Sequence, residues 1–169
     1  MAARNKFDFP LSKITTFTEL GEQQQLNYDT IVEDVSIVVG DADAMKALQV
    51  DESTEVYRLT RVRRIDGERI IIDKDYLLRS VVPRLTRELV KGSLYRYLER
   101  DLGLSIGMAE KVVTVQHVTR EDEYLLDLLG DKVVAVVTSD TRLTDGTLFQ
   151  HTVSRHRIDK FRFVEYAHR

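Results

Sequence analysis

The stretch Arg61-Val62-Arg63-Arg64-Ile65-Asp66-Gly67-Glu68-Arg69-Ile70-Ile71-Ile72-Asp73 predicts a β-hairpin around which the rest of the chain is organised. Apolar and β-branched residues flank the Asp66-Gly67 pair, which is the strongest short-range hairpin signal that a sequence offers. Because side chains alternate along a strand, Arg61 and Arg63 point to the same face. The hairpin therefore presents two guanidinium groups side by side.

The length of the turn decides whether Asp73 shares the face of the arginines. A slip of one residue moves every side chain of a strand to the opposite face, so a two-residue turn would send Asp73 to the far side. A three-residue turn, Ile65-Asp66-Gly67 with its glycine left-handed, would pair Leu59 with Asp73 and Arg61 with Ile71. We expect the three-residue turn, which gathers both arginines and the carboxylate on one face.

The composition indicates one globular domain. The chain has 169 residues, of which 43% are hydrophobic, and typical domains have about 100 to 200 residues. Its 25 basic and 28 acidic residues give no basic surplus of the kind that binds nucleic acid. The absence of cysteine excludes disulfides and thiolate chemistry and favours a reducing compartment.

The ends of the chain and its apolar runs bear on location. Met1–Lys6 has no periodicity and reads as a linker or cloning remnant, so we expect the domain to span residues 7–169. The longest apolar run, Val133–Val137, is far shorter than the roughly 20 residues of a membrane span. The first ten residues are polar and charged, unlike a signal peptide. We therefore expect a cytoplasmic protein.

Hydrophobic periodicity and capping signals along the chain predict an α+β fold, with a mainly antiparallel sheet flanked by helices. Thr16 and Glu19 have the spacing of a capping box, and Gly21 is a possible early stop for that helix. The expected helices are 15–20, 41–48, 85–91, 93–102 and 121–129, and the expected strands outside the first hairpin are 30–39, 108–118, 133–143, 147–158 and 161–166.

The second hairpin repeats the Asp-Gly turn signal at Asp145-Gly146. With a three-residue turn, Phe149 and Val153 would point to one face. The other face would carry four polar side chains, at Gln150, Thr152, Ser154 and His156. Such a face is either solvated or lines a ligand site.

The common catalytic and cofactor motifs are absent. The chain has no G-x-S-x-G, P-loop, H-E-x-x-H or G-x-G-x-x-G sequence. Its four histidines lack metal-ligand spacing, and no pair of carboxylates stands out for acid/base work. We therefore expect no catalytic residue, no metal and no cofactor.

An anion site, in contrast, can be built from the residues present. Arg61 and Arg63 offer planar, permanently charged forks that suit phosphate oxygens. Two expected helix starts, at Phe17-Thr18 and at Ser93, offer amide groups and hydroxyls. Asp73, Gln150 and His156 can accept from and donate to sugar hydroxyls. The alternative is that the arginines are solvated edge residues, that Thr16 and Ser93 are caps, and that Tyr95 belongs to the core.

Three segments together resemble the UTRA effector-binding domain of GntR/HutC-type bacterial transcription regulators. They are Arg61–Glu68, Gly92-Ser93-Leu94-Tyr95, and Ser154-Arg155-His156-Arg157-Ile158-Asp159-Lys160-Phe161-Arg162-Phe163. The resemblance implies a chorismate-lyase-like fold, usually dimeric, that follows an N-terminal winged helix-turn-helix domain. No such DNA reader is expected in this chain, so operator DNA would be bound only through that missing domain.

The resemblance also implies the residues that bind the effector. Its phosphate contacts fall on Phe17, Thr18, Arg61, Arg63, Ser93 and Tyr95. Its sugar contacts fall on Asp73, Gln150 and His156.

Further runs, among them Phe9-Pro10-Leu11-Ser12 and Asp73-Lys74-Asp75-Tyr76, are similar to the branch of this family that represses trehalose utilisation. The branch that senses amino sugars has Glu where this chain has Gln150, and a neutral amide suits a hydroxyl better than an ammonium. The resemblance thus implies trehalose 6-phosphate as the effector. The alternatives are a chorismate-lyase-like enzyme, a sensor of another sugar phosphate such as glucosamine 6-phosphate, and a dimerisation module with an empty pocket.

Overall fold

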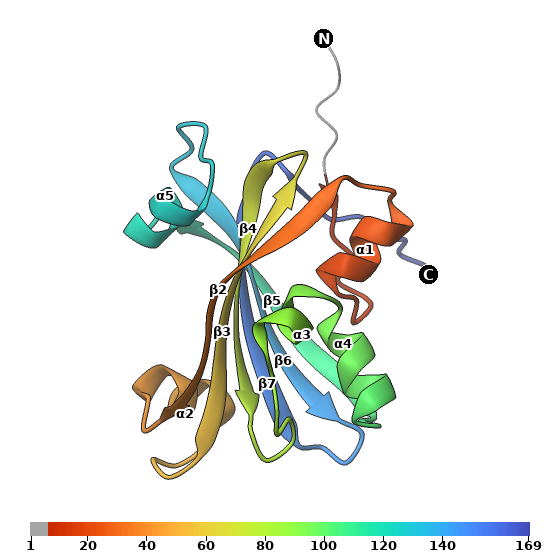
Figure 1. Ribbon diagram of the computed structural model, residues 1–169. Coiled ribbons are helices and arrows are strands. Elements are labelled where there is room, and N and C mark those ends of the chain that lie inside the picture. The colour runs from red at the N-terminus through yellow and green to blue at the C-terminus, as the bar shows by residue number, and fades with distance from the viewer. Residues whose placement is uncertain (1–6) are drawn as a thin grey trace.

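The computed structural model describes residues 7–169, and the linker expected at Met1–Lys6 lies outside the described residues. Within that range the main feature is a six-stranded antiparallel sheet with the order β2-β3-β4-β7-β6-β5 (Figure 1). The α+β prediction is confirmed. The strands are β1 (Phe7–Asp8), β2 (Tyr28–Val39), β3 (Glu55–Ile65), β4 (Glu68–Leu78), β5 (Ile106–His117), β6 (Val133–Leu143), β7 (Leu148–Arg157) and β8 (Phe161–Arg162).

Short helices cover both faces of the sheet. Helices α1, α3 and α4 lie on one face, and α2 and α5 lie on the other, near opposite ends of the strands (Figure 1). The helices are α1 (Phe17–Gln23), α2 (Ala42–Leu48), α3 (Arg87–Lys91), α4 (Leu94–Arg96) and α5 (Arg120–Leu125), and a π-helical turn, η1 (Tyr97–Asp101), continues α4.

Side-chain caps stand at the starts of these helices. Thr16 and Glu19 form the expected capping box at α1. Asp41 accepts from the Ala44 amide at 2.9 Å at the start of α2. Thr119 caps α5 in the same way. Because each cap satisfies an otherwise unpaired amide, the helix starts are well specified by sequence.

Three element ends differ from the prediction. Gly21 does not stop α1, which continues to Gln23; the ring of Tyr28 occupies the space that a Cβ at Gly21 would need. The expected helix at 121–129 ends at Leu125, five residues before Gly130. The last strand ends at Arg162 instead of residue 166, since its short pairing partner, β1, has two residues.

The first hairpin has a two-residue turn, so the expected three-residue register is wrong. Asp66 and Gly67 both have positive φ, at 52° and 78°, as the tightest hairpin turns require. Ile70 is an extra, unpaired residue, because Arg64 faces Arg69 whereas Arg63 faces Ile71. Because the bulge adds one residue to β4, every later side chain of β4 points to the face opposite to the one that a two-residue turn alone would give.

The bulge places Asp73 on the face of the arginines after all. Arg61 stands opposite Asp73, and Leu59 opposite Asp75, so the register is shifted by two residues from the expected one. A shift of two preserves the face of every side chain. The expected gathering of Arg61, Arg63 and Asp73 is therefore present, although through a different turn.

A second bulge changes the face of one residue in β7. Thr141 faces Gln150 and Arg142 faces Leu148, which leaves Phe149 as the extra residue. Phe149 packs in the core on the α4 side of the sheet, not on the opposite face as predicted. Val153 does lie on the opposite face, where it packs near α5.

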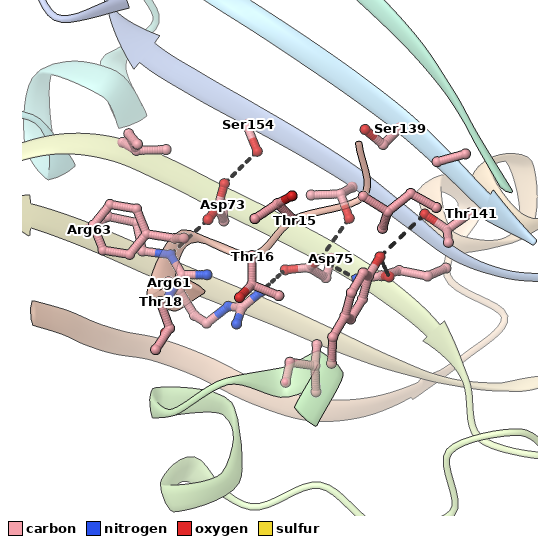
Figure 2. Close-up of a pocket in the computed structure, with 18 of the residues that line it drawn as sticks. Thr15, Thr16, Thr18, Arg61, Arg63, Asp73, Asp75, Ser139, Thr141 and Ser154 are labelled. Atoms are coloured by element: carbon pink, nitrogen blue, oxygen red, sulfur yellow. Dashed lines mark hydrogen bonds and ion pairs between the residues drawn. The ribbon is translucent and has the colours of Figure 1, made fainter. Parts of the chain in front are cut away.

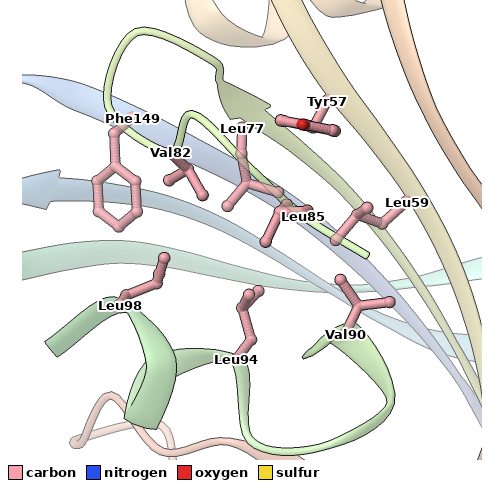
Figure 3. Close-up of a cluster of buried hydrophobic side chains, with 9 residues drawn as sticks. All are labelled: Tyr57, Leu59, Leu77, Val82, Leu85, Val90, Leu94, Leu98 and Phe149. Carbon is pink, nitrogen blue, oxygen red and sulfur yellow. The ribbon is translucent and has the colours of Figure 1, made fainter. Parts of the chain in front are cut away.

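One face of the sheet is divided into an apolar half and a polar half. The apolar half packs under α3, α4 and η1 (Figure 3). It is made of Tyr57, Leu59, Leu77, Val82, Leu85, Val90, Leu94, Leu98 and Phe149. Farther along the same strands, Arg61 and Arg63 follow Leu59, and Asp75 and Asp73 precede Leu77. The core thus ends where the polar residues begin.

Candidate functional site

A cavity of about 100 Å³ lies over the polar half of this sheet face. The sheet forms its floor, the segment before α1 and the first residues of α1 cover it, and the start of α4 forms a side wall. Its lining residues are Phe9, Ile14, Thr15, Thr16, Phe17, Thr18, Arg61, Arg63, Ile71, Asp73, Asp75, Gly92, Leu94, Tyr95, Ala109, Lys111, Ser139, Thr141, Gln150, Thr152 and Ser154.

Two buried ion pairs form the floor of the cavity (Figure 2). Arg63 donates from Nε to Asp73 Oδ2 at 2.7 Å, and Arg61 donates from Nη2 to Asp75 Oδ2 at 2.8 Å. Each arginine bonds a carboxylate on β4 that lies diagonal to it in the ladder. The residue directly opposite Arg63 is Ile71, and the residue directly opposite Arg61 is Asp73. Long side chains can reach such diagonal neighbours. The four groups together carry no net charge.

Asp75 is the most connected residue of the site, and the sequence analysis did not single it out. Its Oδ1 accepts from Gln150 Nε2 at 2.8 Å and from Thr152 Oγ1 at 2.7 Å, while its Oδ2 accepts from Arg61. Its side chain is almost completely buried. The signal that points to it is simple alternation, because Asp75 lies two residues after Asp73 on the same strand.

The buried, charged floor lowers the pKa values of both Asp73 and Arg63, for different reasons. Burial alone would raise the pKa of Asp73, but Arg63, Arg61 and the Ser154 hydroxyl hold it below the ordinary value of 3.8. Burial and repulsion from Arg61 lower the pKa of Arg63 to about 10. At neutral pH both partners are therefore ionised.

A chain of hydrogen bonds connects the floor to the side wall. The Tyr95 hydroxyl donates to Gln150 Oε1 at 2.8 Å, and Gln150 in turn donates to Asp75. Burial raises the pKa of Tyr95 to about 12, so its hydroxyl keeps its proton. Further hydroxyl groups line the cavity at Thr15, Thr16, Thr18, Ser139, Thr141, Thr152 and Ser154. The lining therefore suits a ligand with many hydroxyls.

One buried donor of the two floor arginines has no hydrogen-bond partner within the described residues. Arg61 Nη1 donates to the Val90 carbonyl at 3.2 Å, but Arg61 Nε is buried with no hydrogen-bond partner within residues 7–169. Arg63 uses Nε for Asp73 and Nη1 for Thr30, and its guanidinium lies over the Phe17 ring, 5.1 Å from the ring centre. A buried donor without a partner in a native structure calls for an unseen acceptor.

Seven of the nine residues expected to contact an effector line this cavity. They are Phe17, Thr18, Arg61, Arg63, Asp73, Tyr95 and Gln150. Ser93 and His156 do not line it. The Ser93 hydroxyl accepts from the Arg96 amide at 3.4 Å as the cap of α4, which is the alternative that the sequence left open.

His156 shares the face of the site but lies behind Phe9. Its ring packs edge-on against Phe9 and Phe161, with centroids 4.9 and 5.1 Å apart. It is 2% exposed, and Nε2 has no hydrogen-bond partner in the described part of the chain. A ligand reaches this histidine only if Phe9 moves.

Residues 7–169 contain neither a metal-binding cluster nor a helix that could span a membrane. No cluster of three or more histidines and carboxylates is arranged to hold a metal ion. None of the helices in that range has the length and apolarity needed to cross a membrane.

Comparison with known proteins shows the family. Residues 23–162 match the model of the UTRA domain. This chain belongs to the UTRA domain family. Proteins with similar UTRA domains are transcriptional regulators and repressors, and their solved effector domains have the fold described above.

Three relatives of this UTRA domain come from Bacillus subtilis (strain 168). The regulator TreR is 41% identical, over 98% of this chain and 70% of TreR. The repressor NagR is 22% identical, over 99% of this chain and 69% of NagR. The uncharacterised regulator YydK is 26% identical, over 74% of this chain and 53% of YydK. The chain thus spans between about half and 70% of these relatives.

Solved structures agree with that assignment. The effector-binding domain of the B. subtilis trehalose repressor TreR has a TM-score of 0.78 and 42% identity, and the match covers 83% of this UTRA domain and 98% of that chain. The effector domain of PhnF from Mycobacterium smegmatis has a TM-score of 0.82 at 20% identity, and covers 96% and 99%. The second likeness concerns the fold alone.

Proposed function

We propose that this UTRA domain senses trehalose 6-phosphate and that, in the intact regulator of trehalose utilisation, the ligand changes the affinity for operator DNA. The observation that carries the proposal is the pair of buried arginines beneath a hydroxyl-lined cavity. The relative TreR, whose effector domain is named as that of a trehalose repressor, supports the choice of sugar.

The arginines supply the phosphate subsite in this proposal. Arg61 Nε has no partner in the described structure, and the fork of Arg63 is only partly used. Phosphate oxygens suit both groups, because a guanidinium binds them through parallel N–H donors. Thr18 also lines the cavity and adds a hydroxyl donor, whereas the proton of the Tyr95 hydroxyl is already donated to Gln150.

The charge balance of the floor favours a neutral sugar over an amino sugar. Asp73 and Asp75 are each paired with an arginine, so neither carboxylate is left to face an ammonium. Gln150 adds no charge, and its amide already bonds Asp75 and Tyr95. A desolvated ammonium without a carboxylate partner is costly, whereas sugar hydroxyls fit the neutral hydroxyl lining.

Ligand uptake in this proposal requires the cover of the cavity to move. The volume of about 100 Å³ is well below the roughly 300 Å³ at which ligand pockets begin. Residues 9–16, which form part of the cover, belong to no helix or strand. Displacement of this segment would admit a disaccharide phosphate and also expose His156 behind Phe9.

In the intact regulator the ligand acts through the difference in its affinity for two states of the protein. The relatives are named as HTH-type regulators, so operator DNA is bound in this proposal by an N-terminal domain. The dimeric arrangement usual in the family would couple two UTRA domains to two DNA-binding domains.

Thermal denaturation of the domain tests the proposal. A ligand at a hundredfold excess over its dissociation constant stabilises a protein by about 2.7 kcal/mol. We expect trehalose 6-phosphate to raise the Tm, and trehalose and glucosamine 6-phosphate to have little effect at the same concentration. A rise with glucosamine 6-phosphate alone would contradict the choice of sugar.

A further inference from the structure

Lys111 is a third cation of the cavity, and it differs from the two arginines. It lies on the edge strand β5 and lines the cavity, half-buried. Its Nζ donates to the Lys13 carbonyl at 2.8 Å and lies 5.9 Å from the centre of the Phe9 ring. Within residues 7–169 no carboxylate forms an ion pair with it. The arginines, in contrast, are each paired.

Partial burial of the Lys111 ammonium costs desolvation free energy, and no ion pair within residues 7–169 offsets that cost. Burial lowers the pKa of Lys111 below the ordinary value of 10.5. A lysine at the edge of a sheet normally extends its ammonium into water. Here the ammonium turns toward the cavity, where a carbonyl and an aromatic ring replace only part of its hydration. Groups whose pKa is perturbed by burial cluster at functional sites.

The position of Lys111 separates it from the phosphate subsite. Its strand, β5, and the strand of the arginines, β3, are separated by β6, β7 and β4. Four strand spacings of about 4.8 Å place the two backbones about 19 Å apart. Across the ladder from Lys111 lie Ser139 and then Thr152. Lys111 therefore enters the cavity from the edge of the sheet, four strands away from the strand of the arginines.

We propose that Lys111 binds the hydroxyl groups of the sugar ring that lies farther from the phosphate, and so distinguishes disaccharide phosphates from monosaccharide phosphates. This inference rests on the proposed function, because it takes the arginines as the phosphate anchor. An anchored monosaccharide phosphate ends short of Lys111, whereas a second ring extends toward it. An ammonium has three donors, and the contact with Lys13 uses one of them.

The neighbouring groups fit the same assignment. Ser139 stands opposite Lys111 in the β5–β6 ladder, and the hydroxyl-bearing residues Ser139 and Thr15 both line the cavity (Figure 2). Neutral hydroxyls around one cation suit a polyol, which accepts from the ammonium and exchanges hydrogen bonds with the hydroxyls. No second phosphate is needed to account for the lysine.

Calorimetric titration with two ligands tests the assignment. Lys111→Met keeps the length of the side chain but cannot donate. We expect the variant to bind trehalose 6-phosphate roughly tenfold more weakly, as for the loss of one hydrogen bond from a charged donor, and to bind glucose 6-phosphate as the wild type does. Lys46→Met, an exposed change on α2 across the sheet, is the matched control and should alter neither affinity.

Each other outcome has a definite meaning. An equal loss for both sugar phosphates would overturn the inference, because Lys111 would then act on the shared part of the ligand. Unchanged affinity for trehalose 6-phosphate would also overturn it. If the wild type binds neither sugar phosphate, the proposed function fails and this inference fails with it. The melting temperature of Lys111→Met, expected to equal or exceed that of the wild type, verifies its folding.

Discussion

Arg63 and Asp73 form a buried ion pair at 2.7 Å although they are not opposite each other in the β3–β4 ladder. The pair is diagonal, and the pair of Arg61 and Asp75 repeats the same diagonal two residues away. Both pairs depend on the Ile70 bulge, which brings the acidic residues of β4 onto the face of the arginines. The chemistry of the floor is therefore set by one irregular residue in a hairpin.

Loss of one member of a buried pair should be costly. Arg61→Ala leaves Asp75 buried without its cation, and such changes typically cost about 3 to 5 kcal/mol. The matched control is Arg79→Ala, which removes the exposed Arg79–Glu55 pair and should cost about 0 to 1 kcal/mol. Urea denaturation measures both losses. Losses of similar, small size would show that the buried pair does not hold the floor together.

The planar guanidinium of Arg63 should bind phosphate more strongly than a single positive charge at the same position. Arg63→Lys keeps the positive charge but replaces the planar fork with a single ammonium. We expect it to weaken binding of trehalose 6-phosphate roughly tenfold or more, measured by calorimetry. Val153→Thr, on the opposite face of the sheet, should leave the affinity unchanged. Equal behaviour of the two variants would place the phosphate elsewhere.

The buried histidine should make the stability depend on pH in a defined window. Burial lowers the pKa of His156 from 6.5 to about 4, and Asp73 opposes the shift. Between these values the unfolded chain binds a proton that the folded chain does not, so the free energy of unfolding falls as the pH is lowered from about 6.5 to 4, by up to about 3 kcal/mol. Above that window the histidine is neutral in both states.

His156→Leu removes the titrating group and should flatten this part of the stability curve, as measured by urea denaturation at several pH values. Asp73 contributes in a separate window, because its lowered pKa means that its stabilisation is lost only as the pH falls below about 3.8. A His156→Leu curve as steep as that of the wild type between pH 6.5 and 4 would contradict the assignment.

Gly21 should resist a substitution that usually stabilises helices. Alanine is favoured over glycine within a helix by about 1 kcal/mol. At Gly21, however, a Cβ would lie 2.4 Å from Cδ1 of Tyr28, whose ring packs edge-on against Phe17. We expect Gly21→Ala to destabilise the domain by about 1 to 3 kcal/mol, and Gln23→Ala, on the exposed side of α1, to be nearly neutral. A stabilised Gly21→Ala variant would show that Tyr28 moves freely.

The elements of the fold follow from local sequence, whereas the bulges do not. Capping residues such as Thr16 and Asp41 bond amides three residues away, so short windows of sequence contain the signal. The extra residues Ile70 and Phe149 are apolar residues within apolar runs, and nothing in alternation distinguishes them. Their positions depend on packing against α1 and α4, which lie far along the chain.

The site was predictable to the extent that its residues alternate along strands or match the family pattern. Asp75 was missed because no motif marks it, although alternation places it beside Asp73. Lys111 was missed because local sequence does not show that its strand, β5, is part of the same sheet as the arginines. That relation depends on the order of the strands in the sheet. Ser93 acts as a helix cap, and a sequence gives the same signal for a cap and for an anion ligand.

The central claim is that the domain recognises a phosphorylated disaccharide through its arginine floor. Calorimetric titration of the wild-type domain with trehalose 6-phosphate and, separately, with trehalose tests this claim most directly. The two ligands differ only in the phosphate, so we expect clear binding of trehalose 6-phosphate and at least roughly tenfold weaker binding of trehalose. Equal affinity for both ligands, or no binding of trehalose 6-phosphate, would contradict it.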